Sequence, residues 1–156
     1  MNSTTERPGY WDILIAFIRE GHRAWKERDV AAGAEVERAM GLSSMEAIRF
    51  LQYLEQRDLI EQENVINNIL AYRLAPAGLA FAEGLPSLDA VLAAQTAVIV
   101  KAHAPSEEVK KKAVTIIREA AIKMAFERGI DLAVKAAPTL YNMARTQFPD
   151  LPALPM

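Results

Sequence analysis

The hydrophobic and polar positions of residues 44–57 recur with the period of an α-helix. At about 100° per residue, four apolar positions share one side of this helix: Ala47, Phe50, Leu51 and Leu54. The opposite side carries Met45, Arg49, Gln52 and Gln56, and Ile48 lies at the boundary. Ser43 or Ser44 can cap its N-terminus, because a side-chain oxygen there accepts from an unpaired backbone N–H. We therefore expect a helix that packs one side on a core and presents the other.

Three elements are expected before this helix. Residues 10–20 suit an amphipathic helix that Gly21 ends, since glycine is common just after a helix. A charged connection follows, in which we expect Trp25 to anchor the loop to the core. Residues 29–32 suit a short strand, and residues 34–40 a second helix with Val36 and Met40 turned inward. Gly41 then makes the turn into residues 44–57.

Strand-forming residues follow between Leu59 and Leu74. Asn67 and Asn68 tolerate positive φ angles and suit the tip of a hairpin. Pro76 fits the first position of a helix over residues 77–83, because the first N–H of a helix needs no internal partner. Gly84 and Pro86 are expected to end this part of the chain.

The remaining residues predict helices without strands. Ser87 can cap a helix that ends near residue 102, and Ser106 a long helix that Gly129 ends. The last helical segment, residues 130–148, contains Pro138, which predicts a kink or two shorter helices. Residues 149–156 include three prolines. They predict an extended tail, either mobile or laid on the surface.

The long helix after Ser106 has apolar positions on two sides. One broad side holds Val109, Ala113, Ile116, Ile117, Ala120 and Met124, and the other holds Ile122 and Phe126. Two alternatives follow: burial between several helices, or a homodimer through these C-terminal helices. The Lys110–Lys112 run spreads around the helix, which favours a solvated turn over a phosphate, acidic-partner or membrane-surface contact.

Composition bounds the class of protein. A chain of 156 residues with 51% apolar content can build a substantial core in one compact domain or two small ones. It has no cysteine, which fits a reducing cytoplasm. We find no apolar run that reaches the length of a membrane span. The expectation is a soluble, cytoplasmic protein with no membrane partner.

Catalytic and metal-binding patterns are nearly absent from the sequence. His22 and His103 fall on different elements, and no Gly-rich phosphate loop, H-E-x-x-H or G-x-S-x-G pattern occurs. We therefore expect no enzyme, no metal site and no cofactor. An apolar pocket between the two halves, lined by Trp25 or Tyr141, is an option for a small effector, although core packing is the simpler role for both residues.

Two segments carry a resemblance to a known family: AEVERAMGLSSMEAIRFLQYLEQRDLIE and, after it, YRLAPAGLAFAE. Their order of helix, turn, helix, strand and a strand running into a helix resembles the winged helix-turn-helix of the MarR and PadR type, over about residues 10–84. The resemblance implies a mainly α-helical fold with a small antiparallel β wing in residues 1–86. A C-terminal helical bundle or dimerisation region, residues 87–148, and the proline-rich tail, residues 149–156, would follow.

The resemblance also implies a function, that of a dimeric DNA-binding transcriptional regulator. In such proteins the recognition helix enters the major groove and the wing lies over the backbone or minor groove. Arg49 would then pair with guanine, Gln52 with adenine, and the two serines with phosphate. The implied contact residues are Ser43, Ser44, Met45, Glu46, Ile48, Arg49, Gln52, Asn67, Asn68 and Arg73.

The charge distribution favours a second possible function. Residues 1–86 contain nine basic and thirteen acidic residues, a net charge of −4, whereas residues 87–156 carry +2. Phosphate contacts supply most non-specific affinity for DNA, and an acidic half supplies few of them. Together with the apolar Met45 and Ile48, this charge favours the alternative of a winged helix that binds or assembles with a protein and does not read DNA.

Overall fold

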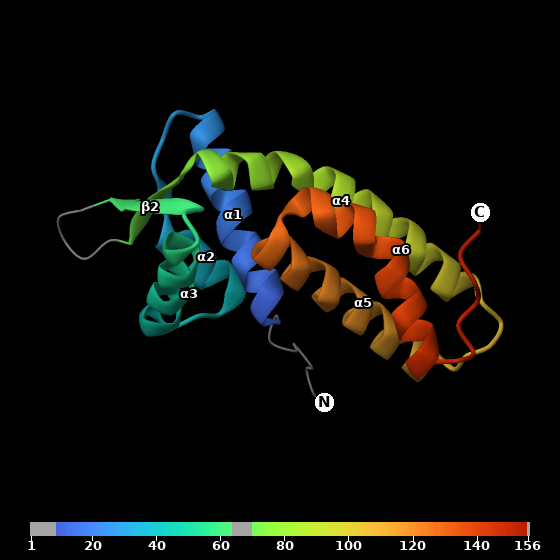
Figure 1. Ribbon diagram of the computed structural model, residues 1–156. Helices are drawn as coiled ribbons and strands as arrows, with labels where there is room; N and C mark the ends of the chain where they lie inside the picture. The colour runs from blue at the N-terminus through green and yellow to red at the C-terminus, as the bar shows by residue number, and fades with distance from the viewer. Residues whose placement is uncertain (1–8, 64–69, 156) are drawn as a thin grey trace. The chain divides into compact units, whose positions relative to one another are not determined.

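The computed structural model describes residues 9–63 and 70–155. Within them the fold is mainly helical, with six helices and a small antiparallel sheet of three strands. The chain divides into two compact units, Met1–Glu83 and Gly84–Met156, which we call unit 1 and unit 2. The helix α4 (Pro76–Lys101) begins in unit 1 and continues into unit 2 (Figure 1).

Unit 1 begins with three helices and one short strand: α1 (Tyr10–Lys26), β1 (Ala31–Ala32), α2 (Gly33–Met40) and α3 (Ser44–Gln56). The hairpin strands β2 (Ile60–Glu63) and β3 (Ala71–Leu74) follow. The sheet has the order β1-β3-β2, with Ala31 opposite Tyr72 and Glu61 opposite Arg73. Figure 1 shows α3 beside the hairpin strand β2, with which it is in contact.

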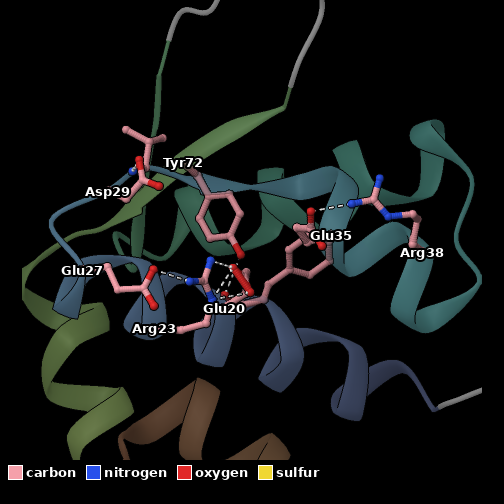
Figure 2. Close-up of polar contacts among 9 residues, drawn as sticks. Glu20, Arg23, Glu27, Asp29, Glu35, Arg38 and Tyr72 are labelled. Carbon is pink, nitrogen blue, oxygen red and sulfur yellow. Dashed lines mark hydrogen bonds and ion pairs between the residues drawn. The ribbon is translucent and has the colours of Figure 1, made fainter.

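Aromatic residues join the elements of unit 1. The ring of Phe17 on α1 stacks near Phe50 of α3, with 6.2 Å between centroids, and meets Tyr72 of β3 edge-on at 5.9 Å. The Tyr72 hydroxyl donates a 2.7 Å hydrogen bond to the Phe17 carbonyl, and Figure 2 shows this ring pointing from the sheet toward α1. Burial raises the pKa of the Tyr72 phenol. This side chain therefore serves as a neutral donor that ties the sheet to α1.

The first helix is longer than its sequence predicts. Gly21 does not end it, and α1 continues to Lys26. A Cβ on Gly21 would lie 2.8 Å from Leu74 Cδ2, so glycine is needed here for close approach of β3 rather than for a helix end. Trp25 consequently lies in the last helical turn with 49% of its surface exposed. The prediction that Trp25 anchors a loop to the core is wrong.

The helix end expected at Gly84 and Pro86 is also wrong, because α4 runs through both residues and through Ser87, the predicted cap of a separate helix. The two compact units nevertheless divide just before Gly84. A Cβ on Gly84 would lie 2.6 Å from Ile130 Cγ2, which makes this glycine another close-packing position. Pro86 is exposed, so its ring adds no clash with the core. The unbroken α4 is long and apolar enough to span a membrane by length and composition alone, a test that core helices also pass.

Unit 2 contains the rest of α4, α5 (Glu107–Arg128) and α6 (Ile130–Gln147). Ser106 caps α5 as predicted, its Oγ accepting from Val109 N at 3.3 Å. α5 and α6 lie side by side (Figure 1). The Gln95 side chain of α4 donates a 3.0 Å hydrogen bond to the Ala137 carbonyl of α6. Since α6 continues through Pro138, the alternative of two shorter helices there is wrong.

Both sides of α5 find burial within the chain. Ile122 and Phe126 are buried, as is Ile117 on the broader apolar side. These positions alone therefore do not require a dimer.

Two lysines of the Lys110–Lys112 run have partners close in sequence. Lys110 Nζ donates to the Val100 carbonyl at 3.1 Å and pairs with Glu107, while Lys112 pairs with Glu108.

The C-terminal tail is laid on unit 2. Leu151 is buried. The Tyr141 hydroxyl donates to the Pro152 carbonyl at 2.6 Å, and Arg145 Nε donates to the Leu151 carbonyl at 3.2 Å. Of the two alternatives that the prolines left open, a tail held on the surface is the one observed.

Candidate nucleic-acid interface

The turn between α2 and α3 sets how α3 is presented. Gly41 ends α2 in the left-handed conformation, with φ 67° and ψ 40°. Leu42 N donates to the Glu37 carbonyl at 2.9 Å, and the Leu42 side chain is buried. This left-handed residue followed by a buried leucine is a common way to end a helix and redirect the chain. The turn is thus fixed by backbone bonds and by one apolar anchor.

A reciprocal cap begins α3. Ser43 Oγ accepts from Glu46 N at 3.2 Å, and Glu46 Oε1 accepts from Ser43 N at 3.0 Å. Serine at the cap was one of the two predicted choices, whereas the capping role of Glu46 was missed. The S-x-x-E spacing was the available signal. Both side chains, expected from the resemblance to contact DNA, are therefore engaged in holding the end of the helix.

The amphipathic pattern of α3 is confirmed. Ala47, Leu51 and Leu54 are buried and Phe50 is half-buried. Three exposed residues, Met45, Arg49 and Gln52, recur at i, i+4 and i+7 and so share one line along the opposite side. We call these three residues the α3 stripe. Ile48 is half-buried beside it.

Carboxylates lie at both ends of α3. The exposed Ser44 Oγ donates to Glu37 Oε1 at 3.0 Å, across the turn from α2. Glu55 accepts from the backbone and side-chain nitrogens of Gln62 at 3.4 and 3.3 Å. Within residues 9–63 and 70–155, Arg49 makes no ion pair. Arg49 is therefore the cation that the stripe itself offers to an anionic ligand.

The other predicted contacts lie on or beyond the hairpin. Arg73 is exposed on β3, and its Nε pairs with Glu63 Oε1 of β2 at 2.9 Å. The base of the hairpin thus presents a partly neutralised cation. Asn67 and Asn68 lie outside the residues that the structure describes. On α2, Arg38 pairs with Glu35, three residues earlier in the same helix (Figure 2).

The comparisons with known proteins add no family assignment. Neither a protein-family model nor a curated protein matches this sequence. Among the described residues, no group of three or more histidine, aspartate or glutamate side chains is placed to hold a metal ion. The arrangement of unit 1 is therefore the basis for inferring a function.

Proposed function

We propose that unit 1 is a winged helix-turn-helix that binds duplex DNA through the α3 stripe. The order of α1, β1, α2, α3 and a two-stranded antiparallel hairpin supports this proposal. The observation that carries it is the exposed line of Met45, Arg49 and Gln52 on a helix capped firmly at its N-terminus. An α-helix of this kind fits the major groove of B-form DNA.

The chemistry of the α3 stripe suits the edges of base pairs. The Arg49 guanidinium can donate two parallel hydrogen bonds to guanine, and the Gln52 amide can pair with adenine. Met45 offers an apolar contact for a thymine methyl group. Because Ser44 already donates to Glu37, it retains its lone pairs as acceptors but no second proton for phosphate. We therefore assign base contacts to the stripe and few phosphate contacts to its surroundings.

Such a surface needs a second copy for useful affinity, and we propose a homodimer through unit 2. Leu132 and Met143 on α6 are 43% and 61% exposed. Eleven residues span close to three helical turns, so these side chains lie on one side of α6. A two-fold dimer through this side would present two α3 stripes to a palindromic site.

One substitution pair tests the DNA-binding proposal. After selection of a preferred duplex from a random pool, Arg49→Ala should weaken binding by about tenfold to a hundredfold, the usual loss for a guanine contact. Arg38→Ala is the matched control, since Arg38 is also an exposed arginine of unit 1 but is paired with Glu35. Equal affinity of Arg49→Ala and the parent protein for the selected duplex would refute the proposed contact.

A second candidate function, docking of a basic protein, is favoured by Met45. Its side chain is 63% exposed; Glu46 is the next residue on α3, and Glu37 accepts a hydrogen bond from the adjacent Ser44. Met45→Lys separates the two functions, because an added cation should strengthen DNA binding and repel a basic partner. Loss of a captured partner with no gain in DNA affinity would favour protein docking.

A further inference from the structure

Unit 1 has a pocket of about 380 Å³ at the end of α1, away from the α3 stripe. It is lined by the last turns of α1, the loop that follows and strand β3: Gly21, Trp25, Arg28, Asp29, Arg73 and Leu74. No residue of α3 belongs to this lining. Its volume falls within the range of pockets that hold small molecules.

The loop that forms one wall is held by its backbone. Arg28 N donates to the Trp25 carbonyl at 3.0 Å, and Asp29 N donates to the Ala24 carbonyl at 2.8 Å. Asp29 Oδ1 then accepts from Val30 N at 2.8 Å, and Figure 2 shows this carboxylate at the end of the loop. The backbone of this wall is therefore fixed by the protein's own hydrogen bonds.

Arg28 occupies a backbone conformation that is unfavourable for its residue type. Its φ is 58°, in the left-handed region where glycine is the usual residue after a helix. Residues held in such conformations occur preferentially at binding sites. An arginine at this position is less stable in its backbone than a glycine would be, and it is one of the residues that line the pocket.

The pocket combines an aromatic wall with two cations. One face of the Trp25 indole is near-parallel to the His22 ring, at 6.0 Å between centroids and 10° between planes. Arg28 and Arg73 are both exposed. Arg73 uses its Nε for Glu63, which leaves four of the five guanidinium N–H donors. Among the lining residues the two arginines outnumber the one carboxylate, Asp29, while Glu63 offsets part of the charge of Arg73.

We propose that this pocket binds a small planar aromatic anion. The ring would stack against Trp25, and the acidic group would lie between the guanidinium groups of Arg28 and Arg73. Cation and aromatic contacts of these types are each favourable for such a ligand. An aromatic carboxylate and a nucleoside monophosphate share this chemistry. The site is distinct from the α3 stripe and does not depend on DNA binding.

The test is isothermal titration calorimetry of the full chain with AMP and with benzoate, in the absence of DNA. We expect saturable binding of at least one probe, and the responsive probe identifies phosphate or carboxylate as the preferred acid. Uncharged adenosine should bind at least tenfold more weakly than AMP. Saturable binding of neither charged probe would overturn the proposal.

Three variants locate the site. Arg28→Gly, Arg73→Gln and Trp25→Ala should each weaken the responsive probe by at least tenfold, while the control Arg38→Gln leaves its affinity unchanged. Arg28→Gly is the sharpest variant, since its backbone conformation suits glycine and the protein should stay folded. Wild-type affinity in Arg28→Gly, or in Trp25→Ala, would overturn the proposed contacts.

Discussion

Ser43 and Glu46 cap each other at the N-terminus of α3, each side chain accepting a hydrogen bond from the other residue's backbone N–H. The carboxylate that sequence resemblance assigns to DNA contact is thus also a structural group. The Glu46 carboxylate adds negative charge one turn from Arg49, and its hydrogen bond to Ser43 N keeps it at the end of the helix. Affinity for an anionic partner and stability of the helix end are consequently set by the same residue.

This relationship predicts opposite outcomes for two substitutions. Ser43→Ala should lower the free energy of unfolding by about 1 kcal/mol, because one backbone N–H of α3 loses its partner. Glu46→Gln should change stability much less, since glutamine also completes a capping box, and it should tighten DNA binding by removing a negative charge. Urea unfolding followed by circular dichroism measures the first, and duplex titration the second. Weaker DNA binding by a stably folded Glu46→Gln would contradict this account.

Two left-handed positions predict stability changes of opposite sign. Arg28→Gly should raise the free energy of unfolding by about 0.5–1 kcal/mol, because relief of the left-handed strain exceeds the entropy cost of glycine. Gly41 has φ 67° and open space where a Cβ would lie, so Gly41→Ala should lower stability by about 1 kcal/mol through backbone strain alone. Thermal unfolding compares the pair. A destabilised Arg28→Gly would mean that its side chain makes a structural contact.

The raised pKa of Tyr72 predicts an alkaline dependence of stability. In the unfolded chain this phenol ionises near pH 10, whereas burial keeps it neutral in the fold. Its contribution is therefore complete below about pH 10 and is lost as the pH rises toward the raised native pKa. Tyr72→Phe should cost about 1 kcal/mol at neutral pH, through the lost bond to the Phe17 carbonyl.

Urea unfolding of the two proteins at a series of pH values checks this prediction. Wild-type stability should fall more steeply than that of Tyr72→Phe above about pH 10. Comparison of the two slopes removes the contributions of the other tyrosines and of the lysines. Parallel slopes would show that Tyr72 ionises equally well in the folded and unfolded protein.

The packed tail predicts that residues near the C-terminus stabilise unit 2. Leu151→Ala should lower the free energy of unfolding by about 2–4 kcal/mol, because it empties a buried site. Leu154→Ala is a nearby comparison at a half-buried leucine and should cost clearly less. Hydrogen exchange at α6 amides reports on unit 2 directly. Equal, small effects of both substitutions would mean that the tail contributes little.

Local signals in the sequence predicted the Ser106 cap and the amphipathic pattern of α3. They failed at Ser87, which lies inside α4 and caps no helix, and where glycine or proline had a tertiary role. Ser106 and the pattern of α3 depend on neighbours within one turn, so a sequence reveals them. A glycine is the usual sequence signal for a helix end, and Gly21 and Gly84 both match it. In the fold, however, each glycine makes room for a side chain distant in sequence, Leu74 and Ile130 respectively. Such packing overrides local propensity and has no local signal.

The candidate site was predictable in part for the same reason. The spacing of Met45, Arg49 and Gln52 fixes a shared side of a helix once the helix is known. The bond from Ser44 to Glu37 and the ion pair of Arg73 with Glu63 join different elements. The left-handed Arg28 depends on the backbone closure after α1 and could not be read from an arginine in a charged run.

The central claim, that the α3 stripe binds duplex DNA, is tested most directly by fluorescence anisotropy of the purified protein with a random duplex pool from low to physiological salt. We predict binding that weakens as salt rises, with a slope of about −0.9 in log affinity per neutralised phosphate, and a shallow total slope because the stripe offers few cations. No binding even at low salt would contradict the claim and favour the protein-docking function of Met45.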